Sequence, residues 1–87
     1  MIWYLYILKC VDNSLYTGIT TDIQRRIKEH EHGKGAKYLR GRSPLKLIYS
    51  EELENQTQAL KREREIKSWS RQKKLLLIKS YIPVYSF

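Results

Sequence analysis

The sequence has one cysteine, Cys10, only two histidines, and no long hydrophobic run. A single cysteine cannot form an internal disulfide, and these residues do not supply the four ligands of a structural zinc site. The longest apolar run, residues 2–8, is far shorter than the roughly 20 residues that span a bilayer, and no basic segment precedes it as in a signal peptide. We therefore expect a cytoplasmic protein that makes no membrane contact and folds by ordinary packing.

Acidic residues are too few to balance the basic ones. The chain has 17 Lys and Arg against 9 Asp and Glu, which gives a formal net charge of +8. A basic protein releases condensed counterions when it neutralises phosphates, so this excess favours a polyanionic partner. We expect that partner to be nucleic acid. The charge itself favours neither DNA nor RNA, and of the two we expect DNA.

The chain shows no internal division. No composition break, repeat or low-complexity stretch interrupts its 87 residues, and the only loop-like segment, residues 33–44, is too short for an interdomain linker. A chain of this length buries about 64% of its unfolded surface, which is enough for a small core. We predict a single domain over residues 1–87.

The first third of the chain predicts a hairpin followed by a helix. Residues 3–10 and 15–19 are aromatic and aliphatic, and the turn formers at 12–14 lie between them. Thr21 and Gln24 then form a capping-box pattern, which predicts a helix over about 22–31.

The remainder predicts one more strand and two more helices. Residues 45–49 have strand composition, Asn55 with Gln58 begins a helix that runs to about residue 69, and Ser70 begins another that Pro83 ends. The resulting order, ββαβαα, predicts an α+β fold in which helices flank a small, three-stranded, mainly antiparallel sheet.

Two polar residues share the apolar stripe of the first predicted helix. At about 100° per residue, Arg26 and His30 fall on the same face as Ile23 and Ile27. A buried guanidinium requires a carboxylate, a bound phosphate or an escape past the rim of the core. Arg26 is therefore either a phosphate ligand or part of an ordinary ion pair, and His30 is either catalytic or a semi-buried histidine with its hydrogen bonds satisfied.

The second predicted helix carries one inward acid. Glu63 lies within about 60° of Ala59 and Ile66 on the helical wheel, whereas Glu65 points elsewhere. A carboxylate on an apolar stripe needs a cation, so Glu63 either pairs with Arg26 or supplies an oxygen ligand to Mg²⁺ or Mn²⁺.

Tyrosines and a glycine stand out in the hairpin. Tyr4 and Tyr6 share one face of the first strand, and Tyr16 lies near Gly18 in the second. Such tyrosines commonly serve in packing. A glycine inside a strand weakens it, however, and often marks the close approach of a backbone or a ligand.

These residues together resemble the GIY-YIG nuclease family, in particular its small stand-alone bacterial members. Tyr4-Leu5-Tyr6 resembles the end of the first signature triplet, and Tyr16-Thr17-Gly18 resembles the second. The segment at 59–63 resembles the one that bears the family's metal-binding glutamate. Over nearly the whole chain, the ordered set that carries the resemblance is Tyr6, Tyr16, Gly18, Arg26, His30 and Glu63.

The resemblance implies a metal-dependent endonuclease that acts in DNA repair or processing. It gives Tyr6 the role of general base or water-positioning group, with Tyr16 and His30 assisting proton movement. It makes Arg26 the group that stabilises charge on the phosphoryl oxygens, and Glu63 the ligand of Mg²⁺ or Mn²⁺. Gly18 is expected to be structural.

A basic segment follows the first predicted helix. Residues 33–44 contain no acid, and the expected nucleic-acid contacts there are Lys34, Lys37, Tyr38, Arg40 and Arg42. The same charges would also suit a solvated loop that only keeps the protein soluble.

Two other classes of function stay open on the sequence. A non-catalytic nucleic-acid-binding module would keep the site only as structure. A protein-interaction adaptor would use the apolar residues 75–85.

Overall fold

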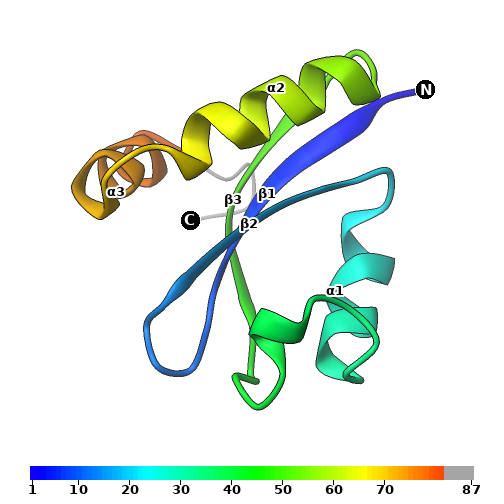
Figure 1. Cartoon of the computed structure of the whole chain (residues 1–87), viewed down its shortest axis with the longest axis vertical. Coiled ribbons are helices and arrows are strands. Elements are labelled where there is room, and N and C mark those ends of the chain that lie inside the picture. Colours follow the sequence, from blue (N-terminus) through cyan, green and yellow to red (C-terminus); the bar gives the residue numbers. More distant parts are fainter. Residues whose placement is uncertain (82–87) are drawn as a thin grey trace.

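The computed structural model describes residues 1–81. Figure 1 shows three strands and three α-helices in the predicted order ββαβαα, with one short 3₁₀ turn, η1, before the third strand. The α+β class is thereby confirmed. The elements are β1 (Trp3–Lys9), β2 (Leu15–Thr20), α1 (Ile23–Glu31), η1 (Lys37–Leu39), β3 (Lys46–Leu53), α2 (Gln56–Lys67) and α3 (Arg71–Lys79).

The sheet has the strand order β2-β1-β3, and both pairings are antiparallel. The register places Tyr6 of β1 opposite Gly18 of β2 on one side and Ser50 of β3 on the other. Because β1 is central and covered on both faces, its residues 5–8 are all buried. This explains why the first strand lacks the polar alternation of a half-exposed strand.

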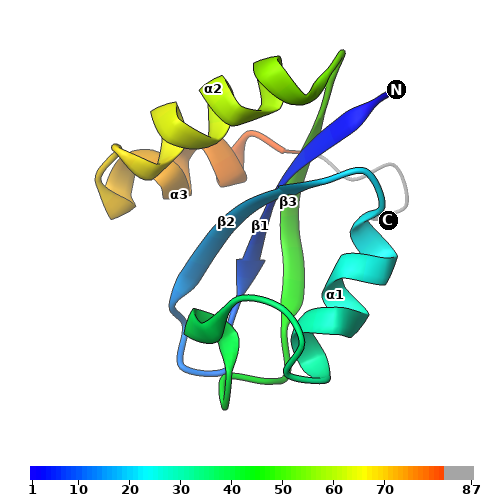
Figure 2. The same cartoon turned by 45° about the vertical axis from the view of Figure 1, so that its right-hand side comes forward.

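Helices cover both faces of the sheet (Figures 1 and 2). α1 and η1 lie on one face, and α2 and α3 lie on the other. The two faces have separate apolar clusters, because neighbouring residues of a strand point to opposite sides. The first is built on Tyr6, Leu8, Cys10, Leu39 and Leu45, and the second on Leu5, Ile7, Tyr49 and Ile66.

Short polar side chains begin the helices, but the predicted cap of α1 is displaced by one residue. The Asp22 carboxylate accepts a hydrogen bond from the N–H of Arg25 at 3.1 Å, so Asp22 and not Thr21 is the N-cap. A carboxylate at this position also interacts favourably with the helix dipole. Asn55 and Ser70 cap α2 and α3 as predicted.

The third strand and the last helix differ from the predicted bounds. β3 extends to Leu53, because its later residues continue to pair with β1 up to Trp3. α3 ends at Lys79, and Pro83, the predicted end, lies outside the described residues. Within residues 1–81, no helix has both the length and the apolar composition needed to cross a membrane.

Candidate active site

Tyr6 lies across the backbone of Gly18, in the neighbouring strand. A Cβ built on Gly18 would lie 2.6 Å from the phenolic oxygen of Tyr6 and 2.8 Å from its Cζ. Both distances are below van der Waals contact, so only glycine permits this approach. The ring of Tyr6 is 1% exposed. Gly18 thus lets a tyrosine of the central strand reach over the outer strand, β2.

The phenolic oxygen of Tyr6 is hydrogen-bonded to His30. Its distance to Nε2 of His30 is 2.9 Å, and His30 is 2% exposed. Nδ1, the other ring nitrogen, accepts a hydrogen bond from the N–H of Ala36 at 3.2 Å. Burial lowers the pKa of His30 below its usual value, and the nearby charge of Arg26 lowers it further. His30 is therefore neutral at pH 7, with both ring nitrogens partnered.

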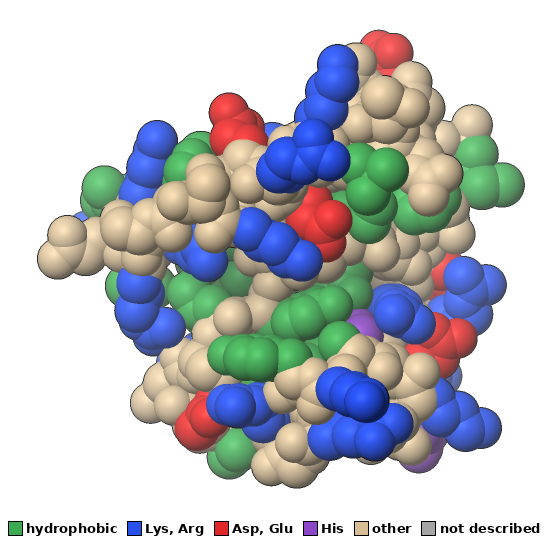
Figure 3. All heavy atoms as spheres, viewed as in Figure 1, with side chains coloured by type: hydrophobic (Ala, Val, Ile, Leu, Met, Phe, Trp, Pro, Cys, Tyr) green, Lys and Arg blue, Asp and Glu red, His purple; other side chains and the backbone are tan. Residues whose placement is uncertain are grey.

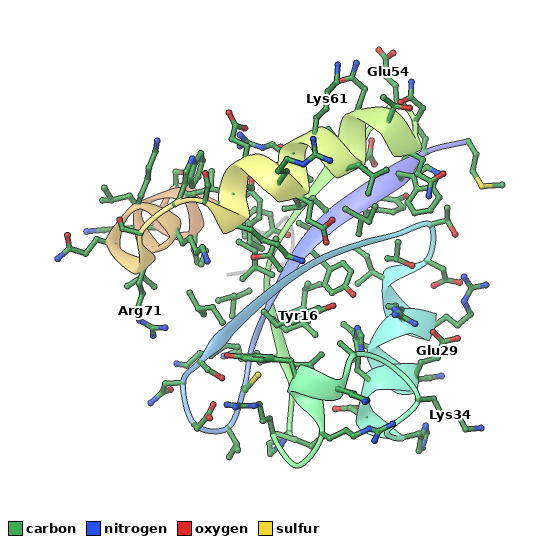
Figure 4. The ribbon with its side chains drawn as sticks, in the orientation of Figure 1. Tyr16, Glu29, Lys34, Glu54, Lys61 and Arg71 are labelled. Atoms are coloured by element: carbon green, nitrogen blue, oxygen red, sulfur yellow. The ribbon has the colours of Figure 1, made fainter. Side chains whose placement is uncertain are left out.

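Tyr16 extends the aromatic cluster toward solvent. Its ring centroid lies 6.3 Å from that of Tyr6 and 5.5 Å from that of His30, and it stacks on Tyr38 at 6.0 Å. In Figure 4, Tyr16 lies between α2 and η1. The cluster therefore joins β1, β2, α1 and η1 at one place.

Charged residues surround the Tyr6 hydroxyl. Burial raises the pKa of Tyr6, and the nearby Tyr16 and the Glu63 carboxylate raise it as well, while the Arg26 guanidinium lowers it. Glu63 is close enough to act on Tyr6 although its helix, α2, packs on the opposite face of the sheet. We attribute this to Gly18, since the hydroxyl lies over the strand that α2 flanks.

Arg26 and Glu63 do not form the ion pair that the sequence left open. Arg26 contacts Glu29 on its own helix at 2.9 Å, and Glu63 contacts Lys67 on its own helix, with 3.2 Å between Oε2 and Nζ. The hypothesis of an Arg26–Glu63 pair is therefore wrong. Residues three or four positions apart on a helix are neighbours, so local partners are reached more easily than one across the sheet.

Glu63 fits a divalent metal that retains most of its water. The Glu63 side chain is 19% exposed. Residues 1–81 contain no cluster of three or more His, Cys, Asp or Glu side chains able to enclose a metal ion. Mg²⁺ commonly binds through one or two carboxylates, with water and substrate phosphate as its other ligands. A single carboxylate at the edge of an open site is consistent with that chemistry.

A groove opens beside the aromatic cluster. Its volume is about 300 Å³. In Figure 3 a hollow with hydrophobic side chains crosses this face, and Lys and Arg side chains lie on both of its banks. We call it the β2 groove. It is lined by Leu15, Tyr16, Thr17, Tyr38, Lys67 and Lys74.

The basic segment 33–44 is only partly available to a partner. Lys37 and Arg40 are exposed. Arg42, in contrast, is bound to the Asp12 carboxylate, and its guanidinium carbon lies 4.4 Å from the centre of the Tyr38 ring. A base that stacked on the face covered by Arg42 would have to displace that side chain. Lys34 points away from Tyr16 (Figure 4).

Sequence reasoning missed residues on both sides of the groove. Lys67 and Lys74 were part of a basic tract between 61 and 74 with no assigned position, and the structure places them on the β2 groove. Gly35 and Ala36 were part of the loop, and the structure places them against His30. The glycine was the available signal, since it commonly marks a close approach.

The apolar residues of the adaptor hypothesis lie apart from this site. Leu75 and Leu76 are exposed on α3, and neither lines the β2 groove. The rest of the predicted surface, beyond residue 81, lies outside the described residues.

Comparison with known proteins gives concordant results. The family model described as the GIY-YIG catalytic domain matches residues 2–75. A UPF0213 protein of Staphylococcus saprophyticus is 56% identical over 75 residues, which cover 86% of this chain and 92% of that protein. A UPF0213 protein of the archaeon Haloquadratum walsbyi is 55% identical over 71 residues, which cover 82% of this chain and 80% of that protein.

Two solved structures are also similar. The solution structure of a UPF0213 protein from Bacillus halodurans is 47% identical, with a TM-score of 0.63, over 98% of this chain and 90% of that one. The solution structure of a protein from E. faecalis is 34% identical, with a TM-score of 0.66, over 100% of this chain and 96% of that one.

Proposed function

The chain belongs to the GIY-YIG catalytic domain family, and from this we propose that it is a metal-dependent endonuclease that hydrolyses phosphodiester bonds in DNA. Membership of the family implies a nuclease-type function. The observation that carries the proposal is the convergence of Tyr6, His30 and Tyr16 beside the charges of Arg26 and Glu63. A merely structural tyrosine has no need of both charges at its hydroxyl.

Tyr6 is the proposed general base or water-positioning group. Its hydroxyl is fixed by His30 at 2.9 Å, so an attacking water molecule would meet an oriented oxygen. Burial raises the pKa of Tyr6, which makes the phenolate costly. Positive charge in the site lowers that cost, and Arg26 supplies one such charge.

Arg26 is the proposed stabiliser of the transition state. Its side chain is 36% exposed and is held by Glu29. A positive charge next to the attacking group would also lie near the phosphoryl oxygens on which negative charge develops. Tyr16, between Tyr6 and the β2 groove, is proposed to help hold the scissile phosphate in place.

Glu63 is the proposed metal ligand, for Mg²⁺ or Mn²⁺. Nucleases of this family are generally dependent on a divalent metal, which would stabilise the leaving oxygen when bound. Lys67 occupies Glu63 at 3.2 Å. The lysine therefore has to release the carboxylate before the carboxylate can bind a cation.

The β2 groove and the exposed part of segment 33–44 are the proposed DNA-binding surface. Lys67 and Lys74 line the groove, and Lys37 and Arg40 are exposed on the segment beyond η1. Contacts of lysine and arginine with phosphates are independent of sequence. We therefore expect binding that tolerates most sequences and weakens strongly with salt.

The experiment that tests the proposal is cleavage of labelled branched, nicked, duplex and single-stranded substrates, with Mg²⁺, with Mn²⁺ and with chelator. Metal-dependent cuts that the Tyr6→Phe variant fails to make would support it. If the wild type binds these substrates but cuts none at any metal concentration, the protein is a binding module that keeps the GIY-YIG scaffold.

A further inference from the structure

The contacts of His30 determine which of its nitrogens carries the proton. The backbone N–H of Ala36 can only donate, so Nδ1 of His30, 3.2 Å away, must be the unprotonated nitrogen. A neutral imidazole then has its proton on Nε2. Nε2 lies 2.9 Å from the phenolic oxygen of Tyr6. In this pair His30 is therefore the donor, and the tyrosine oxygen accepts.

Glycine at position 35 makes this contact possible. A Cβ on Gly35 would lie 1.8 Å from Nδ1 of His30 and 2.6 Å from Cε1, inside the ring's own van der Waals surface. The backbone of residues 35 and 36 thus lies directly against the imidazole edge. Gly33, two residues earlier, has a φ of +75° and nothing within 4 Å of a Cβ built on it, so it serves the turn and not the histidine.

We propose that Gly35 and Ala36 are positioning residues that hold His30 in the Nε2–H form, so that His30 stabilises a Tyr6 phenolate as a hydrogen-bond donor. Because Nε2 already carries a proton, His30 cannot take the proton of Tyr6. A phenolate at position 6 would gain a charge-assisted hydrogen bond from Nε2–H, which is stronger than the bond to a neutral phenol. The catalytic consequence rests on the proposed function, whereas the tautomer does not.

Burial supports the same protonation state. His30 is 2% exposed, and the groups that face it are Tyr6, Tyr16, Arg26, Glu29 and the Ala36 amide. A doubly protonated ring would point Nδ1–H at another N–H. Segment 33–44 therefore has a second role besides its positive charge, which is to fix the hydrogen-bonding direction of the histidine.

The direct test is ¹⁵N NMR of the imidazole of His30 in the wild-type protein at neutral pH. We expect Nε2 to be the protonated, pyrrole-type nitrogen and Nδ1 to be the pyridine-type nitrogen. The opposite assignment, or two averaged shifts, would overturn the proposal. This readout requires no cleavage. A wild type with the expected tautomer but no nuclease activity would refute the proposed function alone.

A variant of the backbone tests whether Ala36 is responsible. Lactic acid in place of Ala36 replaces the amide by an ester and deletes only the N–H, while the methyl group and the carbonyl stay. We expect the two ¹⁵N shifts to move toward an average, and cleavage to fall about tenfold, the factor that one hydrogen bond of ordinary strength supplies. Unchanged shifts would show that Ala36 does not hold the tautomer.

The matched control is the corresponding ester at Lys37. The N–H of Lys37 donates no hydrogen bond within residues 1–81, so the His30 shifts and the cleavage rate should stay as in the wild type. Equal changes in both esters would assign the effect to the loop as a whole and refute the specific role of Ala36.

Discussion

The phenolic oxygen of Tyr6 occupies the space in which any other residue at position 18 would carry its Cβ, 2.6 Å from that point. The strand pairing sets Tyr6 and Gly18 opposite each other. The missing side chain therefore determines both how deeply the tyrosine is buried and which edge of the sheet its hydroxyl reaches. Loss of the glycine should disturb the site before it disturbs the fold.

The first prediction concerns this contact. Gly18→Ala should displace the Tyr6 hydroxyl from His30 and lower the free energy of unfolding by about 1–3 kcal/mol, the usual cost of overpacking. Urea unfolding and cleavage assays measure the two effects. Gly41→Ala is the control, because position 41 has a φ of +74° but no atom within 4 Å of the new Cβ. It should lose stability through backbone strain and still cleave.

The second prediction isolates the hydroxyl of Tyr6. Tyr6→Phe keeps the ring but leaves Nε2–H of the buried His30 without its acceptor, which should cost about 1–3 kcal/mol of stability. Cleavage should fall at least 100-fold if the hydroxyl acts as proposed. Tyr4→Phe, two residues away on the same strand, should change neither quantity much. Full activity of Tyr6→Phe would exclude Tyr6 from the chemistry.

The third prediction concerns Glu63 and the metal. Glu63→Gln should reduce cleavage by orders of magnitude, because it removes the proposed charged ligand at almost constant volume. The rise in melting temperature that we expect with Mn²⁺ should also disappear, while DNA binding persists or tightens. Glu65→Gln, on the exposed side of the same helix, is the matched control. A Mn²⁺ effect that survives Glu63→Gln would place the metal elsewhere.

The fourth prediction separates the two banks of the β2 groove. Neutralising Lys37 and Arg40 together should reduce the slope of log K against log salt by about 1.8, and neutralising Lys67 and Lys74 should do the same, at about 0.9 per lost phosphate contact with duplex DNA. Lys61, which points away from the sheet (Figure 4), should contribute little and serves as the control.

Arg42 is left out of these variants on structural grounds. Its contacts with Asp12 and the Tyr38 ring mean that neutralising it should loosen segment 33–44 as well as remove a charge. A slope that stays constant when Lys37 and Arg40 are neutralised would assign those two charges to solubility.

The fifth prediction is the pH dependence of stability. The pKa of His30 is lowered in the folded state from its usual 6.5, mainly by burial. Below about pH 6.5 the unfolded chain takes up a proton that the folded chain does not, so the free energy of unfolding should decrease as the pH falls. His30→Gln should flatten this decrease. His32→Gln, at the exposed neighbouring histidine, should leave it unchanged.

The local periodicity of the sequence was sufficient to predict the order of the elements and the inward faces. Repeats of 3.6 and 2 residues depend only on neighbouring positions, so they placed His30 and Glu63 among apolar residues before any packing was known. The N-cap was predicted one residue early because Thr21 and Asp22 are both good caps, and the chain used the charged one.

The contacts that define the site depend on tertiary structure. The Tyr6–His30 bond joins residues 24 positions apart, and the Arg42–Asp12 pair joins residues 30 apart. Both require the strand register and the packing of α1 and η1 on one face of the sheet. The ion pairs that actually form at Arg26 and Glu63 are local, because a partner one helical turn away costs less order than one across the sheet. The sequence by itself determined which residues point inward; only the packing of the two faces decided which of them meet.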